Sequence, residues 1–195
     1  MALRDAPAGV PVIAQHPIYP ATSAHNDWPS YRNFKDGYLL TEDGMAWFGE
    51  QYSWTIGDWR AHPLDFDQTG MPPSLVVTAS LDPLSDQGRA YAEKLREAGV
   101  PTVHREAEGN IHGYINLRQG IPSSQDDIDG NLAALKAMLA EIGKPTFDRE
   151  RVAALVADWS AQRRTYFVDV AQDLHGYMAT LTPEERDKFL VLARD

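Results

Sequence analysis

An alternation of strand-like and helix-like segments between residues 72 and 142 constrains the fold of this chain more than any other feature. "PPSLVVTASL" is a compact apolar run bounded by turn residues, which is typical of a strand covered on both faces. "SDQGRAYAEKLREAG" follows, with apolar residues at helical spacing and a glycine where a helix ends. "VPTVHREAE" resembles a second short strand, and "SQDDIDGNLAALKAMLAEIG" a second helix. Strands and helices that alternate with short links predict a parallel α/β sheet.

The N-terminal part of the chain is less regular. "VPVIAQHPIYP", over residues 10–20, predicts a further buried strand that leads into a turn. Residues 21–72 are rich in aromatic residues, Gly, Asp and Pro without a long period, and they predict one helix over "TEDGMAWFGEQYS" with Thr41 as its N-cap. Two interpretations of the aromatic segment stay open: a surface layer packed on the sheet, or the wall of a substrate pocket.

The C-terminal part of the chain has a different composition. In the second helix of the core we expect one apolar face, made of Ile128, Leu132, Leu135, Met138, Leu139 and Ile142. A linker, "GKPTFDRE", then precedes a purely helical pattern: a long amphipathic helix over about 148–179 and a second helix that opens with a capping box at Thr182. The predicted organisation is an α/β domain over 1–143 and a helical hairpin over 147–195, which must bury its apolar stripe against the α/β body or a second copy of the chain.

Composition excludes several classes of function. The formal net charge is −10, with 28 Asp and Glu against 18 Lys and Arg, so we expect no nucleic-acid partner. No stretch approaches the roughly 18 unbroken apolar residues needed to cross a membrane, and the N-terminus does not resemble a signal peptide, so we expect a cytoplasmic protein. The chain has no cysteine, which excludes a Cys nucleophile. Its histidines lack metal-ligand spacing, so we predict neither a metal nor a cofactor.

Two residues stand where catalytic groups gather in a parallel sheet. Asp82 follows the strand "SLVVTASL", and His112 follows "VPTVHREAE" after a short turn. The carboxyl ends of parallel strands meet at one edge of the sheet, so we expect both side chains there. A carboxylate can accept the imidazole N–H, fix the tautomer and stabilise the imidazolium. Taken singly, an Asp-Pro turn and a His-Gly loop are ordinary loop features.

The stretch "MPPSLVVTASLDPLSDQGRAYAEKLREAGVPTVHREAEGNIHGYINL" resembles the C-terminal third of the hormone-sensitive-lipase-like branch of α/β-hydrolases, which contains bacterial carboxylesterases and acetyl esterases. The resemblance extends over roughly residues 1–142. It implies a partial α/β-hydrolase fold with three remaining parallel strands, in which Asp82 is the triad acid and His112 the triad base. Asp86 matches a further motif position, and we expect it to cap the following helix.

The sequence also departs from this family. Such enzymes hold their nucleophile in a Gly-x-Ser-x-Gly elbow and their oxyanion donors in an upstream His-Gly-Gly-Gly stretch, and neither motif occurs here. By resemblance, Met1 falls just after the missing serine, so we expect the chain to be truncated. Only the last three of the family's eight strands would remain, which predicts an exposed sheet edge.

Two classes of function follow. In the first, the chain is a fragment of a carboxylic-ester hydrolase that retains Asp82 and His112 and acts on a small ester only if a separate polypeptide complements it with the serine. In the second, it is a non-enzymatic oligomerisation or binding module built on a hydrolase remnant. Both lead us to expect a homo-oligomer or a partner chain that covers the exposed sheet edge.

Overall fold

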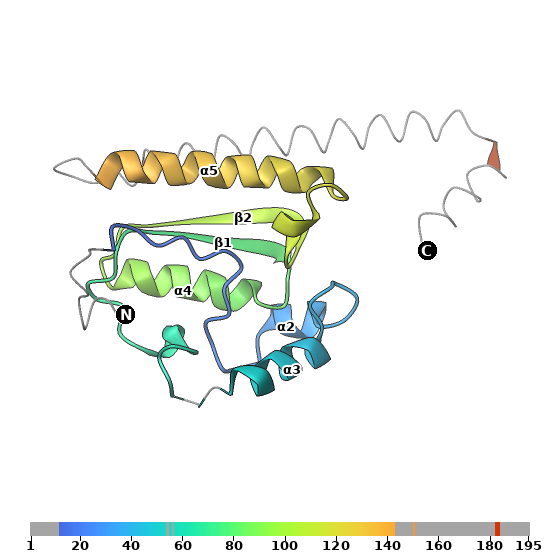
Figure 1. Cartoon of the computed structure of the whole chain (residues 1–195), viewed down its shortest axis with the longest axis horizontal. Helices are drawn as coiled ribbons and strands as arrows, with labels where there is room; N and C mark the ends of the chain where they lie inside the picture. The colour runs from blue at the N-terminus through green and yellow to red at the C-terminus, as the bar shows by residue number, and fades with distance from the viewer. Residues whose placement is uncertain (1–11, 54, 56, 143–149, 151–181, 184–195) are drawn as a thin grey trace. The chain divides into compact units, whose positions relative to one another are not determined.

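Two parallel strands, each followed by a helix, organise the part of the chain that the structure describes (Figure 1). The computed structural model describes residues 12–53, 55, 57–142, 150 and 182–183. β1 (Ser74–Leu81) precedes α4 (Ser85–Glu97), and β2 (Thr102–Ile111) precedes α5 (Pro122–Ile142). The two strands pair in parallel. The predicted parallel α/β arrangement is therefore confirmed.

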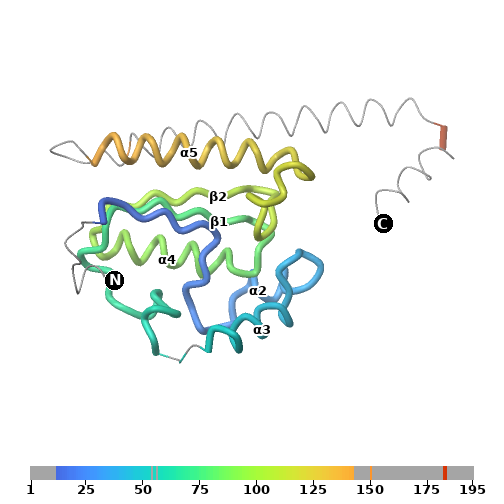
Figure 2. The backbone as a smooth tube through the Cα atoms, viewed as in Figure 1, coloured from blue at the N-terminus to red at the C-terminus, as the bar shows by residue number. Residues whose placement is uncertain are grey.

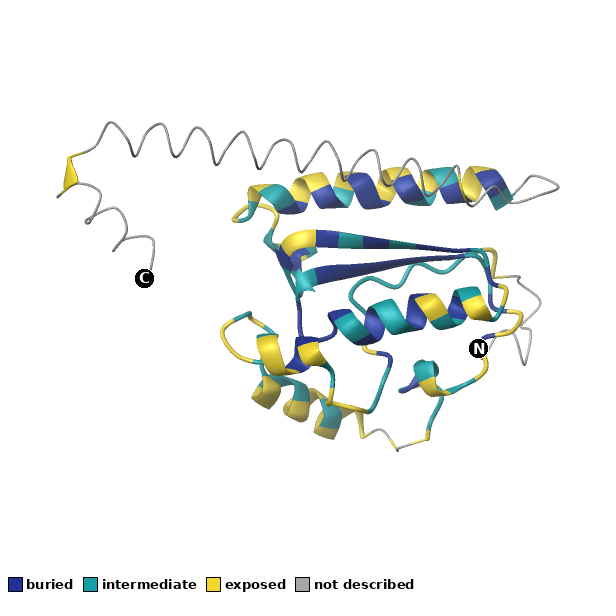
Figure 3. Ribbon diagram, turned by 180° about the vertical axis from the view of Figure 1, so that it is seen from behind, coloured by how far each residue is buried: buried dark blue, intermediate teal, exposed yellow. Residues whose placement is uncertain are grey.

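The helices cover opposite faces of the sheet, and β1 is buried along most of its length between them (Figures 1 and 3). Alternate residues of β1 divide between two apolar clusters, as the two-residue period of a strand requires. The cluster under α5 contains Leu75, Val77, Val103, Ala134 and Met138. The cluster under α4 contains Met71, Val76, Tyr91, Ala92, Leu95 and Val100. The unbroken apolar run of β1 predicts a strand covered on both faces, and this prediction is confirmed.

A third segment, residues 12–20, runs parallel to β1 on the edge opposite β2 (Figure 2). Gln15 N donates to Pro73 O at 2.9 Å, and Tyr19 N donates to Val77 O at 2.6 Å. Pro17 lies between these two residues and has no N–H, so one bond of the ladder is missing. The predicted third strand is therefore an extended segment held by isolated bridges.

Short helices lie between segment 12–20 and β1 in the sequence. These are α2 (Pro29–Phe34), α3 (Glu42–Tyr52) and the 3-10 turn η1 (Pro63–Asp65). The predicted N-cap of α3 is confirmed, because the Thr41 hydroxyl accepts a hydrogen bond from Gly44 N at 3.1 Å. None of the residues of α3 is buried. The aromatic side chains of this helix therefore lie largely at the surface.

Two details of the predicted helices are wrong. Leu132 and Leu139 of α5 are 47% and 41% exposed, because this helix turns Asp127 and Asn131 inward to meet a buried charge on β2. Asp86 does not cap α4, whose N-cap is Leu84 with no side-chain cap bond.

The helical hairpin predicted over 147–195 lies outside the described residues apart from Glu150, Thr182 and Pro183, and it stays a prediction. No helix within the described ranges is both long and apolar enough to span a membrane.

Candidate active site

The structure brings the two predicted site residues together at the carboxyl ends of adjacent strands. Asp82 directly follows β1 and His112 directly follows β2. His112 Nδ1 lies 2.8 Å from Asp82 Oδ2. This distance is that of a charge-assisted hydrogen bond between an imidazole N–H and a carboxylate.

Asp82 is fully buried, and both of its carboxylate oxygens have a partner. Oδ2 accepts from His112, and Oδ1 accepts from Leu84 N at 2.8 Å in the turn that opens α4. A buried carboxylate with two donors has its orientation fixed from both sides. The local turn Asp-Pro-Leu therefore holds the carboxylate so that one oxygen faces the imidazole.

An irregularity in the strand pairing places His112 beside Asp82. Ala79 pairs with Ala107, but Leu81 pairs with Ile111, so β2 has two more residues than β1 over this stretch. Gly109 lies in the bulged part with φ +74°, a left-handed conformation that glycine adopts without strain. Its N–H donates to the Ser80 hydroxyl at 2.8 Å, which ties the bulge to β1.

The second nitrogen of the imidazole, Nε2, faces away from Asp82 and has no hydrogen-bond partner among the described residues. It is not enclosed either, because the His112 side chain is 25% exposed and Nε2 is not a buried atom. No described serine bonds to it. An imidazole held at Nδ1 and open at Nε2 can accept a proton from a hydroxyl placed beside it.

Sequence reasoning missed a second hydroxyl–imidazole pair. Thr78 Oγ1 lies 2.9 Å from His104 Nε2 and donates to Glu106 Oε2 at 3.1 Å, between the sheet and α4. The threonine is fully buried, so no substrate reaches its hydroxyl. Burial lowers the pKa of His104 to about 4, against an opposing effect of Glu106. This pair is therefore structural. The only sequence signal for it is the polar residue within each strand pattern, Thr78 in "VTAS" and His104 in "VHRE".

A buried polar network links β2 to α5 behind the site. The Arg105 guanidinium is almost fully buried and pairs with Asp127 Oδ1 at 3.0 Å. Asn131 Oδ1 accepts from Arg105 Nη1 at 2.7 Å, and Asp127 Oδ2 accepts from Asn110. Asn131 Nδ2 in turn donates to the Tyr114 hydroxyl at 2.7 Å. Nothing in the sequence pattern indicates this network, because charged residues in a periodic pattern are expected on the solvent face.

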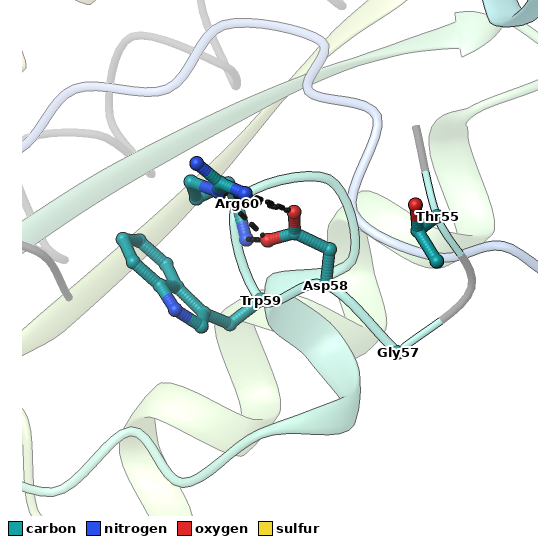
Figure 4. Close-up of a pocket in the computed structure, with 5 residues that line it drawn as sticks. All are labelled: Thr55, Gly57, Asp58, Trp59 and Arg60. Carbon is teal, nitrogen blue, oxygen red and sulfur yellow. Dashed lines mark hydrogen bonds and ion pairs between the residues drawn. The ribbon is translucent and has the colours of Figure 1, made fainter. Parts of the chain in front are cut away.

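Two cavities lie near α3. The larger, about 970 Å³, has apolar walls from Met45, Phe48 and Tyr52 of this helix and reaches Leu84, two residues beyond Asp82. The smaller, about 480 Å³, is a shallow hollow around residues 57–60, where Arg60 binds Asp58 through both oxygens (Figure 4). That ion pair occupies the guanidinium. Within the described residues no cluster of His, Asp or Glu could hold a metal ion.

Comparison with known proteins identifies relatives. Lipase 2 of Moraxella sp. (strain TA144) is 35% identical over 130 residues, which cover 63% of this chain and 30% of that protein. Carboxylesterase NlhH of Mycobacterium tuberculosis is 34% identical over 138 residues, 67% of this chain and 43% of that protein. The chain thus spans less than half the length of these curated relatives.

Solved structures of esterases share the fold. The thermostable esterase from Pseudomonas putida ECU1011 superimposes with a TM-score of 0.60 at 35% identity, covering 67% of this chain and 44% of that one. The Pyrobaculum calidifontis esterase gives 0.61 at 33% identity, with 66% and 44% covered. A family profile described as an alpha/beta hydrolase fold matches residues 1–116. The chain therefore belongs to the α/β-hydrolase family, in its hormone-sensitive-lipase-like branch of carboxylesterases.

Proposed function

We propose that this chain provides the acid and the base of a serine ester hydrolase, with Asp82 and His112 in those two roles. The observation on which the proposal rests is the 2.8 Å bond between His112 Nδ1 and Asp82 Oδ2, with Nε2 open to a reactant. Membership of the carboxylesterase branch supports ester hydrolysis as the reaction class.

The reaction begins when His112 Nε2 accepts the proton of a serine hydroxyl as the oxygen attacks the ester carbonyl. The imidazolium then gives this proton to the leaving alcohol as the carbonyl re-forms. A water molecule repeats both steps on the acyl-enzyme and releases the acid. Throughout, Asp82 holds the imidazole at Nδ1 and stabilises its positive charge.

The serine itself comes from outside these 195 residues. None of the nine serines has a glycine two residues before and two after it, and no His-Gly-Gly-Gly stretch occurs. We propose that a separate polypeptide segment contributes both the elbow serine and the oxyanion donors. Within the described residues, the unpaired edge of segment 12–20 favours such a partner. Among the described residues, the backbone groups of Ala14, His16 and Ile18 have no hydrogen bond on the side away from β1.

The larger cavity is the proposed site for the apolar part of a small ester. Its walls include Met45, Phe48 and Tyr52, and Leu84 joins it to the turn that holds Asp82. Such mixed walls, apolar with a few polar groups, are usual for small-molecule sites. A substrate in this cavity favours the interpretation of the aromatic segment, residues 21–72, as a pocket wall.

A complementation assay tests the proposal. The chain is mixed with the region of the Pseudomonas putida esterase that it does not match, and hydrolysis of p-nitrophenyl acetate is followed. We expect hydrolysis only in the mixture. His112→Ala should abolish it, and Asp82→Asn should lower the rate by roughly 10⁴-fold because the amide favours the wrong tautomer. His25→Ala is the matched control, since this imidazole is exposed.

Two results would count against the proposal. One is hydrolysis by the mixture that survives His112→Ala. The other is a stable complex of the two polypeptides, seen by light scattering, that has no hydrolysis above the uncatalysed rate. The second result, together with self-association of the chain alone, would favour the alternative of a non-enzymatic assembly module.

A further inference from the structure

The backbone of Tyr19 adopts an unusual conformation beside the candidate site. Its φ is +38°, in the left-handed region that residues other than glycine seldom occupy. Its N–H is nevertheless held by Val77 O at the end of segment 12–20. A conformation of this kind persists only where surrounding contacts fix it, and such residues cluster at functional sites.

With this backbone conformation, the Tyr19 ring lies against the imidazole of His112. The two ring centroids are 4.5 Å apart, with an angle of 57° between the ring planes. On its other side Tyr19 meets the ring of Tyr114 edge-on, at 5.7 Å and 71°. Both separations lie in the range in which ring pairs attract each other. Tyr19 is therefore in contact with His112 and Tyr114 at once.

Tyr114 is a rigid support for this contact. Its side chain is fully buried, and its hydroxyl accepts from Asn131 Nδ2 at 2.7 Å. Asn131 is held in turn by the buried guanidinium of Arg105, which pairs with Asp127. The series of contacts runs without a break from α5 and β2 to the imidazole ring. A partly exposed histidine is thus connected to a buried polar network.

We propose that Tyr19 is a positioning residue, which holds the His112 ring so that Nδ1 faces Asp82 and Nε2 faces the reactant. Asp82 fixes one nitrogen of the imidazole but leaves the ring free to tilt about that bond. The Tyr19 ring closes one face and removes this freedom. Burial and the nearby Asp82 charge raise the pKa of the Tyr19 phenol, so it stays neutral beside the pair. The inference extends the proposed function, since it gives a role to a third residue of the same site.

The Nδ1 proton of His112 provides a direct test by NMR of the chain alone. A proton shared with Asp82 resonates downfield of the amide protons, and its loss in Asp82→Asn assigns it. Tyr19→Phe keeps the ring, and Tyr19→Leu removes it at an equal backbone cost. We expect Phe to preserve the exchange rate of this proton with water. Leu should raise that rate roughly two- to tenfold, the factor that an aromatic pair contributes.

An exchange rate in the Leu variant equal to that of the wild type would overturn the inference. So would an equal increase in the Leu and Phe variants, which would assign the effect to the hydroxyl and not to the ring. Amide exchange in β1 reports whether each variant remains folded, and Tyr19→Met replaces the Leu variant if that one unfolds. The exchange rate of the His112 Nδ1 proton can be measured without the elbow serine. A failed complementation assay therefore leaves this test intact, and a negative result here leaves the proposed hydrolysis standing.

Discussion

We expect His104 to make the stability of this chain sensitive to mild acid. The imidazole lies between the sheet and α4, where Thr78 accepts a hydrogen bond from Nε2–H because its own proton goes to Glu106. Burial lowers the pKa of His104 from 6.5 to about 4. Glu106 opposes the shift, while Arg96 and Arg89 reinforce it. The folded state therefore holds the imidazole neutral at a pH where the unfolded chain would protonate it.

The sign and size of the effect follow from linkage. Between pH 6.5 and 4 the unfolded state binds more protons than the folded state, so the free energy of unfolding falls as the pH falls. Above pH 6.5 the imidazole is neutral in both states, so no stability is lost there. The lowered pKa of His104 corresponds to a total loss of about 3 kcal/mol, of which about 2 kcal/mol is already lost at pH 5. Such a loss is a large fraction of the stability of a typical domain.

Urea unfolding at pH 7.5 and pH 5, followed by tryptophan fluorescence, measures this loss. Other groups contribute to acid sensitivity, so the informative quantity is the difference between wild type and His104→Gln. The glutamine amide can still donate to Thr78 but does not titrate. We expect its change in unfolding free energy between the two pH values to be smaller by about 2 kcal/mol. His25→Gln, at an exposed position, should behave as wild type. Identical pH dependence in wild type and His104→Gln would refute the reasoning.

Two substitutions in α5 test the packing behind the site. Asp127→Ala leaves the buried Arg105 without its carboxylate and should cost about 3–5 kcal/mol in urea unfolding. The exposed neighbour Asp126→Ala should cost little, and similar values for both would contradict a buried ion pair. Met138→Ala should cost about 2–5 kcal/mol in thermal or urea unfolding, because the side chain is fully buried under the sheet. The half-exposed Leu139→Ala is its control, and an equal loss there would contradict the observed helix orientation.

The sheet and the site pair were predictable because their signals are local. An unbroken apolar run identifies β1, and a residue that directly follows a parallel strand must lie at its carboxyl edge. Asp82 and His112 were therefore placed together without knowledge of any contact. The same reasoning identified Thr41 as an N-cap, since this position depends only on its own turn.

The parts that could not be predicted depend on partners distant in sequence. The buried charge of Arg105 on β2 is stable only because Asp127, 22 residues later on α5, pairs with it. That pairing rotates α5 away from the face that its leucines indicate. Tyr19 offers another example, since nothing in "IYP" predicts a left-handed tyrosine. Its conformation depends on contacts with β1, His112 and Tyr114.

The two surplus residues of β2 beside Gly109 make chain length itself a requirement of the site. Successive side chains of an extended strand point in opposite directions, so deleting a single residue from 108–110 would send the imidazole to the far side of the sheet. Deleting two would remove the bulge and leave Ile111 opposite Leu81, so that His112 would still follow the strand beside Asp82. A one-residue deletion here should thus be tolerated far less well than a substitution or a two-residue deletion, and homologous sequences one residue shorter would need a different way to bring a base to Asp82.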